Sequence, residues 1–72
     1  MNSNQTNYPM NRNEILARCE YQASVMGDIL MVFPVENNYA IAVGAGATKN
    51  DAKANAWNNW RVWLPKIKEA LA

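Results

Sequence analysis

Two apolar runs separated by a pair of asparagines constrain the fold of this chain more than any other feature. The runs are Ile29–Glu36 and Tyr39–Ala45, and Asn37-Asn38 lies between them. Asparagine tolerates the positive φ angles of a two-residue type I′ turn, so the pattern predicts a tight β-hairpin. Both faces of this hairpin are apolar, whereas a hairpin with one wet face would alternate apolar with polar residues. Each face therefore needs a cover.

The pairing that follows from this turn predicts what each face presents. Pairing outward from the turn places Val32 opposite Val43 and Leu30 opposite Ala45 on one face. On the other face, large residues of the first strand lie opposite small residues of the second. These small residues would form a trough in which a helix can lie close, and they are Ala40, Ala42 and Gly44.

A first helix is expected before the hairpin. Asn11 and Glu14 have the spacing of a capping box. Apolar residues recur at three- and four-residue steps after it, which predicts an amphipathic helix over residues 12–26. Gly27 is a normal residue just beyond a helix C-terminus.

A second helix is expected after the hairpin. Thr48 is its N-cap, with Asp51 three residues later. Pro65 cannot donate its backbone hydrogen bond, so the helix should kink or restart there, leaving a short helix over residues 66–71. Val62 falls on the polar side and is expected to be exposed. One apolar stripe predicts the buried face, with Ala52, Ala56, Trp60, Trp63, Ile67 and Leu71.

These elements predict an α+β fold of the order α-β-β-α. We expect one domain over residues 11–72, preceded by a disordered asparagine-rich tail over residues 1–10. The hairpin either lies between the two helices, or both helices cover one face and another chain buries the second. A two-stranded sheet is barely stable alone, so a homodimer that joins two hairpins into a four-stranded sheet is expected.

Composition argues against several classes of function. The chain of 72 residues has no histidine and one cysteine, Cys19, so it lacks the ligands of a zinc site and cannot form an internal disulfide. No base is available to activate the thiol, and no pair of carboxylates is placed for acid–base chemistry. The longest apolar run, Ile29–Val35, is too short to cross a bilayer. We expect a cytoplasmic protein that is not an enzyme and needs no cofactor or metal.

The junction between the second strand and the second helix has a motif. It reads Gly44-x-Gly46-x-Thr48-Lys49-x-x-Ala52-Lys53-x-x-Ala56. A helix N-terminus with free N–H groups and Lys49 could hold an anion, while glycines that permit a tight turn are the alternative. The motif resembles the last strand and last helix of double-stranded-RNA-binding domains. That resemblance implies that Lys49 and Lys53 contact phosphates, and it implies a sheet of three strands where two are expected here.

Three tryptophans in the second helix point to protein contacts. Trp60 and Trp63 lie within the apolar stripe, whereas Trp57, Arg61 and Leu64 lie along one flank and could form a contact patch. The expected order of elements is similar to small phage α-β-β-α sandwich proteins. This likeness implies a protein that binds a host protein, in the host cytoplasm, as an inhibitor of defence. Double-stranded nucleic-acid binding through Thr48, Lys49 and Lys53 is the alternative, and a structural or assembly subunit is a third.

Overall fold

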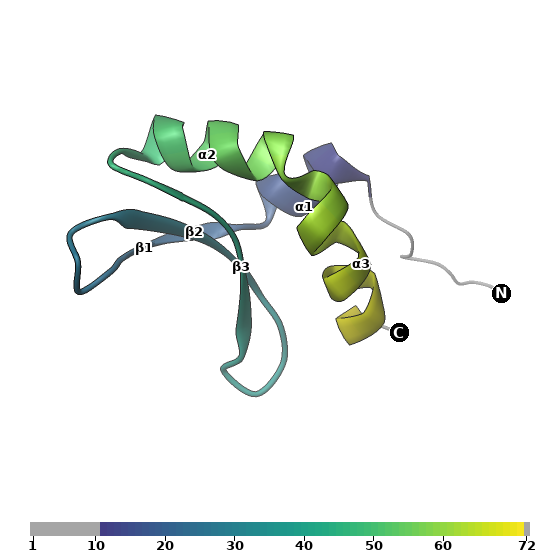
Figure 1. Ribbon diagram of the computed structural model, residues 1–72. Coiled ribbons are helices and arrows are strands. Elements are labelled where there is room, and N and C mark those ends of the chain that lie inside the picture. Colours follow the sequence, from purple (N-terminus) through teal and green to yellow (C-terminus); the bar gives the residue numbers. More distant parts are fainter. Residues whose placement is uncertain (1–10, 72) are drawn as a thin grey trace, which may run out of the picture.

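The computed structural model describes residues 11–71, so the expected tail over residues 1–10 lies outside the described part. The described chain is α+β and has three helices and three strands (Figure 1). In chain order the elements are α1 (Arg12–Ala17), β1 (Glu20–Ala23), β2 (Ile29–Pro34), β3 (Ala40–Gly46), α2 (Lys49–Asn58) and α3 (Trp60–Leu71).

The strands form one antiparallel sheet in the order β1-β2-β3. The sheet therefore has one strand more than the two-stranded hairpin expected from the sequence, and the first helix predicted over residues 12–26 is wrong. Its N-terminus is confirmed, because the Asn11 side chain accepts from the Glu14 N–H at 2.8 Å and Glu14 accepts from the Asn11 N–H at 3.2 Å. The helix ends early, at Ala17, and the N–H groups of Arg18 and Cys19 donate to the Ile15 and Leu16 carbonyls. Glu20–Ala23 then extends and pairs with β2.

Ser24 explains why a strand and not a helix follows α1. Its hydroxyl accepts hydrogen bonds from the N–H groups of Met26 and Asp28, both at 3.2 Å. Its own N–H donates to the Asp28 carbonyl at 2.8 Å. Serine side chains compete with helical hydrogen bonding in this way. Gly27, with φ of +94°, completes this turn between β1 and β2 and is not a helix cap.

The turn between β2 and β3 is the one that the sequence predicts. Asn37 and Asn38 have φ of 65° and 61°, as a type I′ turn requires. The register differs near the turn, because Val32 pairs with Ala42 instead of Val43. A bulge leaves Val43 as an extra residue, after which Leu30 pairs with Ala45 as predicted.

The bulge changes which small residues face the helices. Ala40 and Ala42 pair with Pro34 and Val32 on the face away from the helices, so the predicted trough of Ala40, Ala42 and Gly44 is wrong in part. Gly44 does face α2, and a Cβ there would lie 2.5 Å from the Ala52 carbonyl oxygen. The absence of a side chain at this position lets α2 lie directly against β3.

The second helix breaks earlier than expected. The chain turns at Asn59, between α2 and α3, and Pro65 lies within α3, so the predicted short helix over residues 66–71 is wrong. The break exposes carbonyl groups at the end of α2, and one of them gains two donors. The Ala56 carbonyl accepts from the Asn59 N–H at 3.2 Å and from the indole N–H of Trp63 at 2.6 Å. The buried indole thereby fixes α3 against the end of α2.

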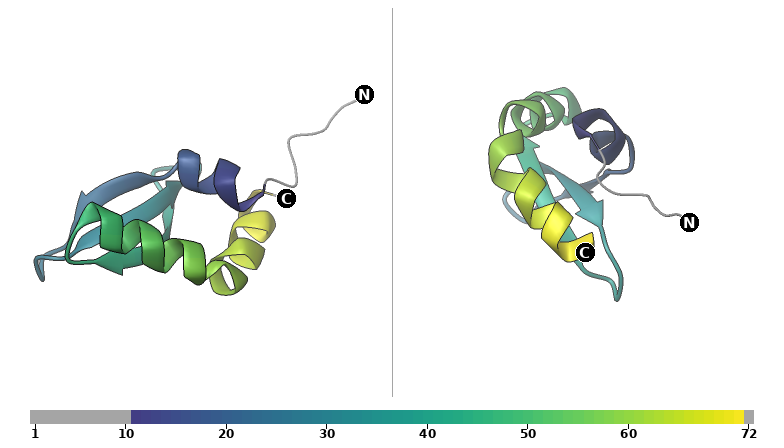
Figure 2. Two further views of the ribbon diagram at one scale, coloured as in Figure 1. Left: turned by 90° about the horizontal axis from the view of Figure 1, so that it is seen from above. Right: turned by 90° about the vertical axis from the view of Figure 1, so that its right-hand side faces the viewer.

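All three helices lie on one face of the sheet (Figure 2). The core between them contains Ile15 and Leu16 of α1, together with side chains of the sheet and of the predicted stripe on α2 and α3. Val62 is exposed, as expected. The remaining core residues are Met31, Phe33, Val43, Ala52, Ala56, Trp63 and Ile67, with Trp60 and Leu71 partly buried against them.

The opposite face of the sheet has no helix over it among the described residues (Figure 1). Leu30 and Val32 alternate with the core residues of β2 and point to this side, next to Ala42 and Ala45 of β3. Glu20 and Gln22 of β1 border it. Of the two arrangements left open by the sequence, the structure has both flanking helical segments on one face and leaves the second face apolar.

Candidate functional site

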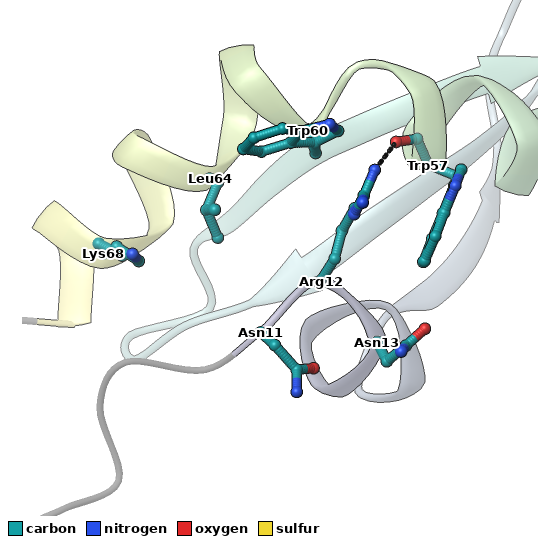
Figure 3. A pocket seen from close by; sticks show the side chains of 7 residues that line it. All are labelled: Asn11, Arg12, Asn13, Trp57, Trp60, Leu64 and Lys68. Carbon is teal, nitrogen blue, oxygen red and sulfur yellow. Dashed lines mark hydrogen bonds between the residues drawn. The ribbon is translucent and has the colours of Figure 1, made fainter.

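A groove runs between α1 and the junction of α2 with α3 (Figure 3). It has a volume of about 470 Å³. Its walls come from both ends of the described chain, which the core brings together through Ile15 and Leu16. The lining residues are Asn11, Arg12, Asn13, Trp57, Trp60, Leu64 and Lys68.

Arg12 is the central side chain of this groove. Its guanidinium carbon lies 4.0 Å from the ring centre of Trp57 and 4.9 Å from that of Trp60, and Figure 3 shows it between the two indoles. One of its N–H groups donates to the Trp57 carbonyl at 3.3 Å. Guanidinium groups bind the negative faces of aromatic rings in this way. The stack holds a cation in a fixed place at the groove wall.

The capping box on α1 explains why Arg12 reaches this position. Asn11 and Glu14 exchange hydrogen bonds and fix where the helix begins. Ile15 and Leu16 are buried, and Arg12 precedes them by three and four residues, so it lies on the same face of this short helix. Arg12, the first residue of the helix, is then directed toward α2 and is half-buried. Loss of the cap would move the cation as well as destabilise the helix.

The groove carries positive charge. Arg12 and Lys68 are its ionised residues, and no carboxylate belongs to its lining. A guanidinium has five N–H donors, which leaves most of those on Arg12 for other acceptors after its bond to the Trp57 carbonyl. Two indoles and one guanidinium are planar groups. The groove thus suits an anionic ligand that has a flat part.

A basic strip on α2 continues from this groove. A shallow hollow of about 420 Å³ is lined by Asn50, Lys53, Ala54, Trp57 and Asn58. Trp57 lines both this hollow and the groove, so the two are adjacent. Lys49, one helical turn before Lys53, lies with its Nζ 5.5 Å from the ring centre of Tyr21 on β1. Lys49 and Lys53 therefore lie on the flank of α2 that leads toward Arg12.

The residues predicted for a protein partner come together in part. Trp57 is 39% exposed, and it lines the groove together with the half-buried Leu64. Arg61 is exposed but does not line the groove. Its guanidinium carbon lies 5.0 Å from the ring centre of Trp60. Of the three predicted residues, Arg61 therefore lies outside the groove, where its guanidinium packs on Trp60.

The three residues predicted to bind an anion, Thr48, Lys49 and Lys53, have different roles in the structure. Thr48 is confirmed as the N-cap of α2, because its hydroxyl oxygen accepts from the Asp51 N–H at 3.1 Å. Lys49 and Lys53 are exposed, and their ammonium groups are available to a ligand. Thr48 therefore acts first on the helix, whereas the two lysines can contact a partner.

Sequence reasoning missed Arg12, Trp60 and Lys68 as members of the site. Arg12 and Trp57 are 45 positions apart, and no local pattern links them. Trp60 was expected in the core, and it is half-buried there with its ring toward the groove (Figure 3). In the sequence, Arg12 beside the capping box was the one visible sign of the groove, and it does not specify a ligand.

The potential metal ligands of the described residues do not cluster, and the one cysteine among them is half-buried. Within residues 11–71 no three potential metal ligands come together. Burial raises the pKa of Cys19 from 9.0 to about 11, so its thiol stays protonated at neutral pH. The thiol also donates to the Ile15 carbonyl at 3.3 Å. None of the helices in this part of the chain has the length and apolar character needed to cross a membrane.

Comparison of the chain with protein-family models, with curated proteins and with solved structures finds no match. Function is therefore inferred from the residues themselves. Two surfaces stand out on the described part of the chain. One is the basic and aromatic face formed by α1 and α2, and the other is the apolar face of the sheet.

Proposed function

We propose that the protein binds double-stranded RNA across the face formed by α1 and the first half of α2. The observation that carries this proposal is the order of the first five elements, α-β-β-β-α, with one three-stranded antiparallel sheet. The glycine–lysine motif resembles double-stranded-RNA-binding domains, and the resemblance implied a third strand. β1 supplies that strand, and the motif spans the connection from β3 to α2.

The glycines of the motif support the position of the lysines. Gly44 and Gly46 both face α2, and a Cβ on Gly46 would lie 2.5 Å from the Cβ of Asp51. Close contact with the sheet fixes the first two turns of α2, from which Lys49 and Lys53 project. The partial positive charge at the helix N-terminus adds to theirs. Asn50 stands where the family has a further lysine, so fewer phosphates would be neutralised.

The chemistry of the face favours a duplex read by its shape. Proteins recognise double-stranded RNA mainly through phosphates and 2′-hydroxyl groups and little through sequence. Lys49, Lys53 and Arg12 can contact phosphates, and Asn13 and Asn50 can contact hydroxyl groups. Binding through so few cations is expected to be modest in affinity and independent of sequence. Each phosphate contact also makes binding weaken with added salt.

Fluorescence anisotropy with a labelled RNA duplex of about 16 base pairs, a length that such domains typically cover, tests the proposal. We expect the wild-type protein to bind at low salt, and the double variant Lys49→Ala, Lys53→Ala to bind at least tenfold more weakly. Lys66→Ala is the matched control, since Lys66 lies on α3 beside Glu69 and away from the α2 strip. Absence of wild-type binding at low salt, or equal loss in the control, would overturn the proposal.

A second function, protein–protein contact, is favoured by the uncovered face of the sheet. Val25 and Met26 at the β1–β2 turn are almost fully exposed, while Leu30 on that face is half-buried and Val32 is only 5% exposed. Exposed apolar side chains beside a sheet face with no helix over it are a candidate interaction site. A homodimer through this face or through the β3 edge, and inhibition of a host protein by a phage-type product, are the forms this function would take.

Sedimentation of the wild-type protein and of Leu30→Glu tests this second function. A charge in the middle of an apolar interface prevents association, so a dimer of the wild type should become a monomer in the variant. Ala54→Glu, on the exposed side of α2, is the control for the added charge. A wild-type monomer at micromolar concentration rules out the dimer, and higher oligomers would instead indicate an assembly subunit.

A further inference from the structure

We infer that the groove around Arg12 takes an unpaired nucleotide at the end of a duplex, so that the protein prefers RNA with a single-stranded overhang. The inference rests on the proposed function, because the duplex would lie along α2. The groove would add a second, separate contact. The class of ligand is a nucleotide with its base exposed and its phosphate ionised.

The planar groups of the groove are suited to stacking with a nucleotide base. Arg12 lies between the indoles of Trp57 and Trp60, with distances of 4.0 Å and 4.9 Å to the ring centres. Unpaired bases stack on aromatic rings and on guanidinium planes, and this contact tolerates any base. A base can extend the stack or replace the guanidinium on an indole. Either contact needs a base that is not paired within a duplex.

The charges of the groove are suited to the phosphate of a nucleotide. Arg12 and Lys68 line it without a carboxylate, so the groove is positively charged and attracts the phosphate next to a stacked base. Asn11 and Asn13 are amide side chains at the rim, where base edges and ribose hydroxyl groups offer donors and acceptors. Leu64 is the one aliphatic side chain of the lining. The apolar part of the groove is therefore mainly the two flat indole rings, which favours a planar base over an aliphatic peptide anchor.

The size of the groove, and its continuity with the hollow on α2, fit a nucleotide at the end of a duplex. A volume of about 470 Å³ is within the range of pockets for small ligands, so a nucleotide fits and a duplex does not. Trp57 lines both the groove and the hollow that contains Lys53. A strand that leaves a duplex bound at Lys53 thus reaches the groove across Trp57.

The test compares two RNA duplexes that share the same base pairs, one blunt and one with three unpaired nucleotides at each 3′ end. We expect the wild-type protein to bind the tailed duplex about tenfold more tightly, since one stacked base has an effect of that order. Arg12→Lys keeps the charge but loses the planar group, and Lys68→Ala removes the second cation. Both variants should lose the preference for the tail, and Lys68→Ala, which lies outside the duplex-binding face, should keep blunt-duplex binding. Lys66→Ala should keep both, and circular dichroism should show every variant folded.

The outcomes separate this inference from the proposed function. Equal affinity for blunt and tailed duplexes overturns the inference and leaves duplex binding intact. Binding of the single-stranded trinucleotide alone, sensitive to Lys68→Ala and without any duplex binding, keeps the groove and overturns the proposed function. Displacement of the tail by an acidic peptide as readily as by a free trinucleotide would assign the groove to a protein partner and overturn the inference.

Discussion

Gly44→Ala tests the packing that places the lysines of α2. A Cβ at this position would lie 2.5 Å from the Ala52 carbonyl oxygen, 2.6 Å from the Ala56 nitrogen and 2.7 Å from the Ala56 Cβ. Two of these atoms are backbone and the third is a Cβ, so no side-chain rotation relieves the clash. The helix must move away from β3, and the core contacts of Ala52 and Ala56 are then lost.

The expected loss follows from the size of such clashes. Overpacking of a close-packed core costs about 1–3 kcal/mol, and the lower backbone entropy of alanine in the unfolded chain returns about 0.4–1 kcal/mol. We expect a net loss of about 1–2 kcal/mol, since no flexible group can adapt. For a domain of this length that lowers Tm by roughly 4–16 °C. A small domain has a free energy of unfolding of only several kcal/mol, so this loss is a large part of its total stability.

Thermal unfolding followed by circular dichroism measures the effect. Ala45→Ser is the matched control, since it also adds one heavy atom to β3 but at an exposed position on the other face. The control should unfold within about 0.5 kcal/mol of the wild type. If Gly44→Ala were as stable as the control, the direct contact between α2 and β3 would be refuted, and with it the placement of Lys49 and Lys53.

Three further predictions test other parts of the structure. Trp63→Phe removes the buried hydrogen bond to the Ala56 carbonyl and should lower the free energy of unfolding by about 1–3 kcal/mol in urea titrations; an unchanged midpoint would show that α3 is not fixed by this bond. Thr48→Ala should cost about 1 kcal/mol through loss of the cap, and Thr48→Ser should restore most of it; equal stability of both variants would argue against capping. Cys19, whose pKa burial raises from 9.0 to about 11, should react with a thiol reagent at pH 8 much more slowly than free cysteine does. Because its folded-state pKa is the higher one, the stability that it contributes is present below pH 9 and is lost as the pH rises through 11, and Cys19→Ala should remove this part of the pH dependence.

Local signals in the sequence predicted the ends and turns of this fold. The capping box at Asn11, the cap at Thr48 and the positive φ angles of Asn37-Asn38 depend on side chains acting within a few residues, and all three are confirmed. The buried stripe of the C-terminal helices was also visible, because burial follows the helical period.

Features that depend on competition between structures were not predicted. The apolar spacing through Cys19 fits a helix. The Ser24 turn and the pairing with β2 are more favourable, so residues 20–23 form β1 instead. The bulge at Val43 lies next to Gly44, which was interpreted as a site of close helix packing and not as a sign of a bulge, and it moves Ala40 and Ala42 to the opposite face. The groove was invisible for a different reason. Arg12 meets Trp57 only through the tertiary fold.

Amide chemical-shift mapping of the isotope-labelled protein with an RNA duplex of about 16 base pairs tests the central claim most directly. Binding across α1 and α2 predicts shifts that cluster at residues 11–13 and 49–57 and that diminish as salt is added. The amides of Leu30, Val32 and Ala42, on the far face of the sheet, should stay in place. No shifts at low salt, or shifts confined to that far face, would contradict the account.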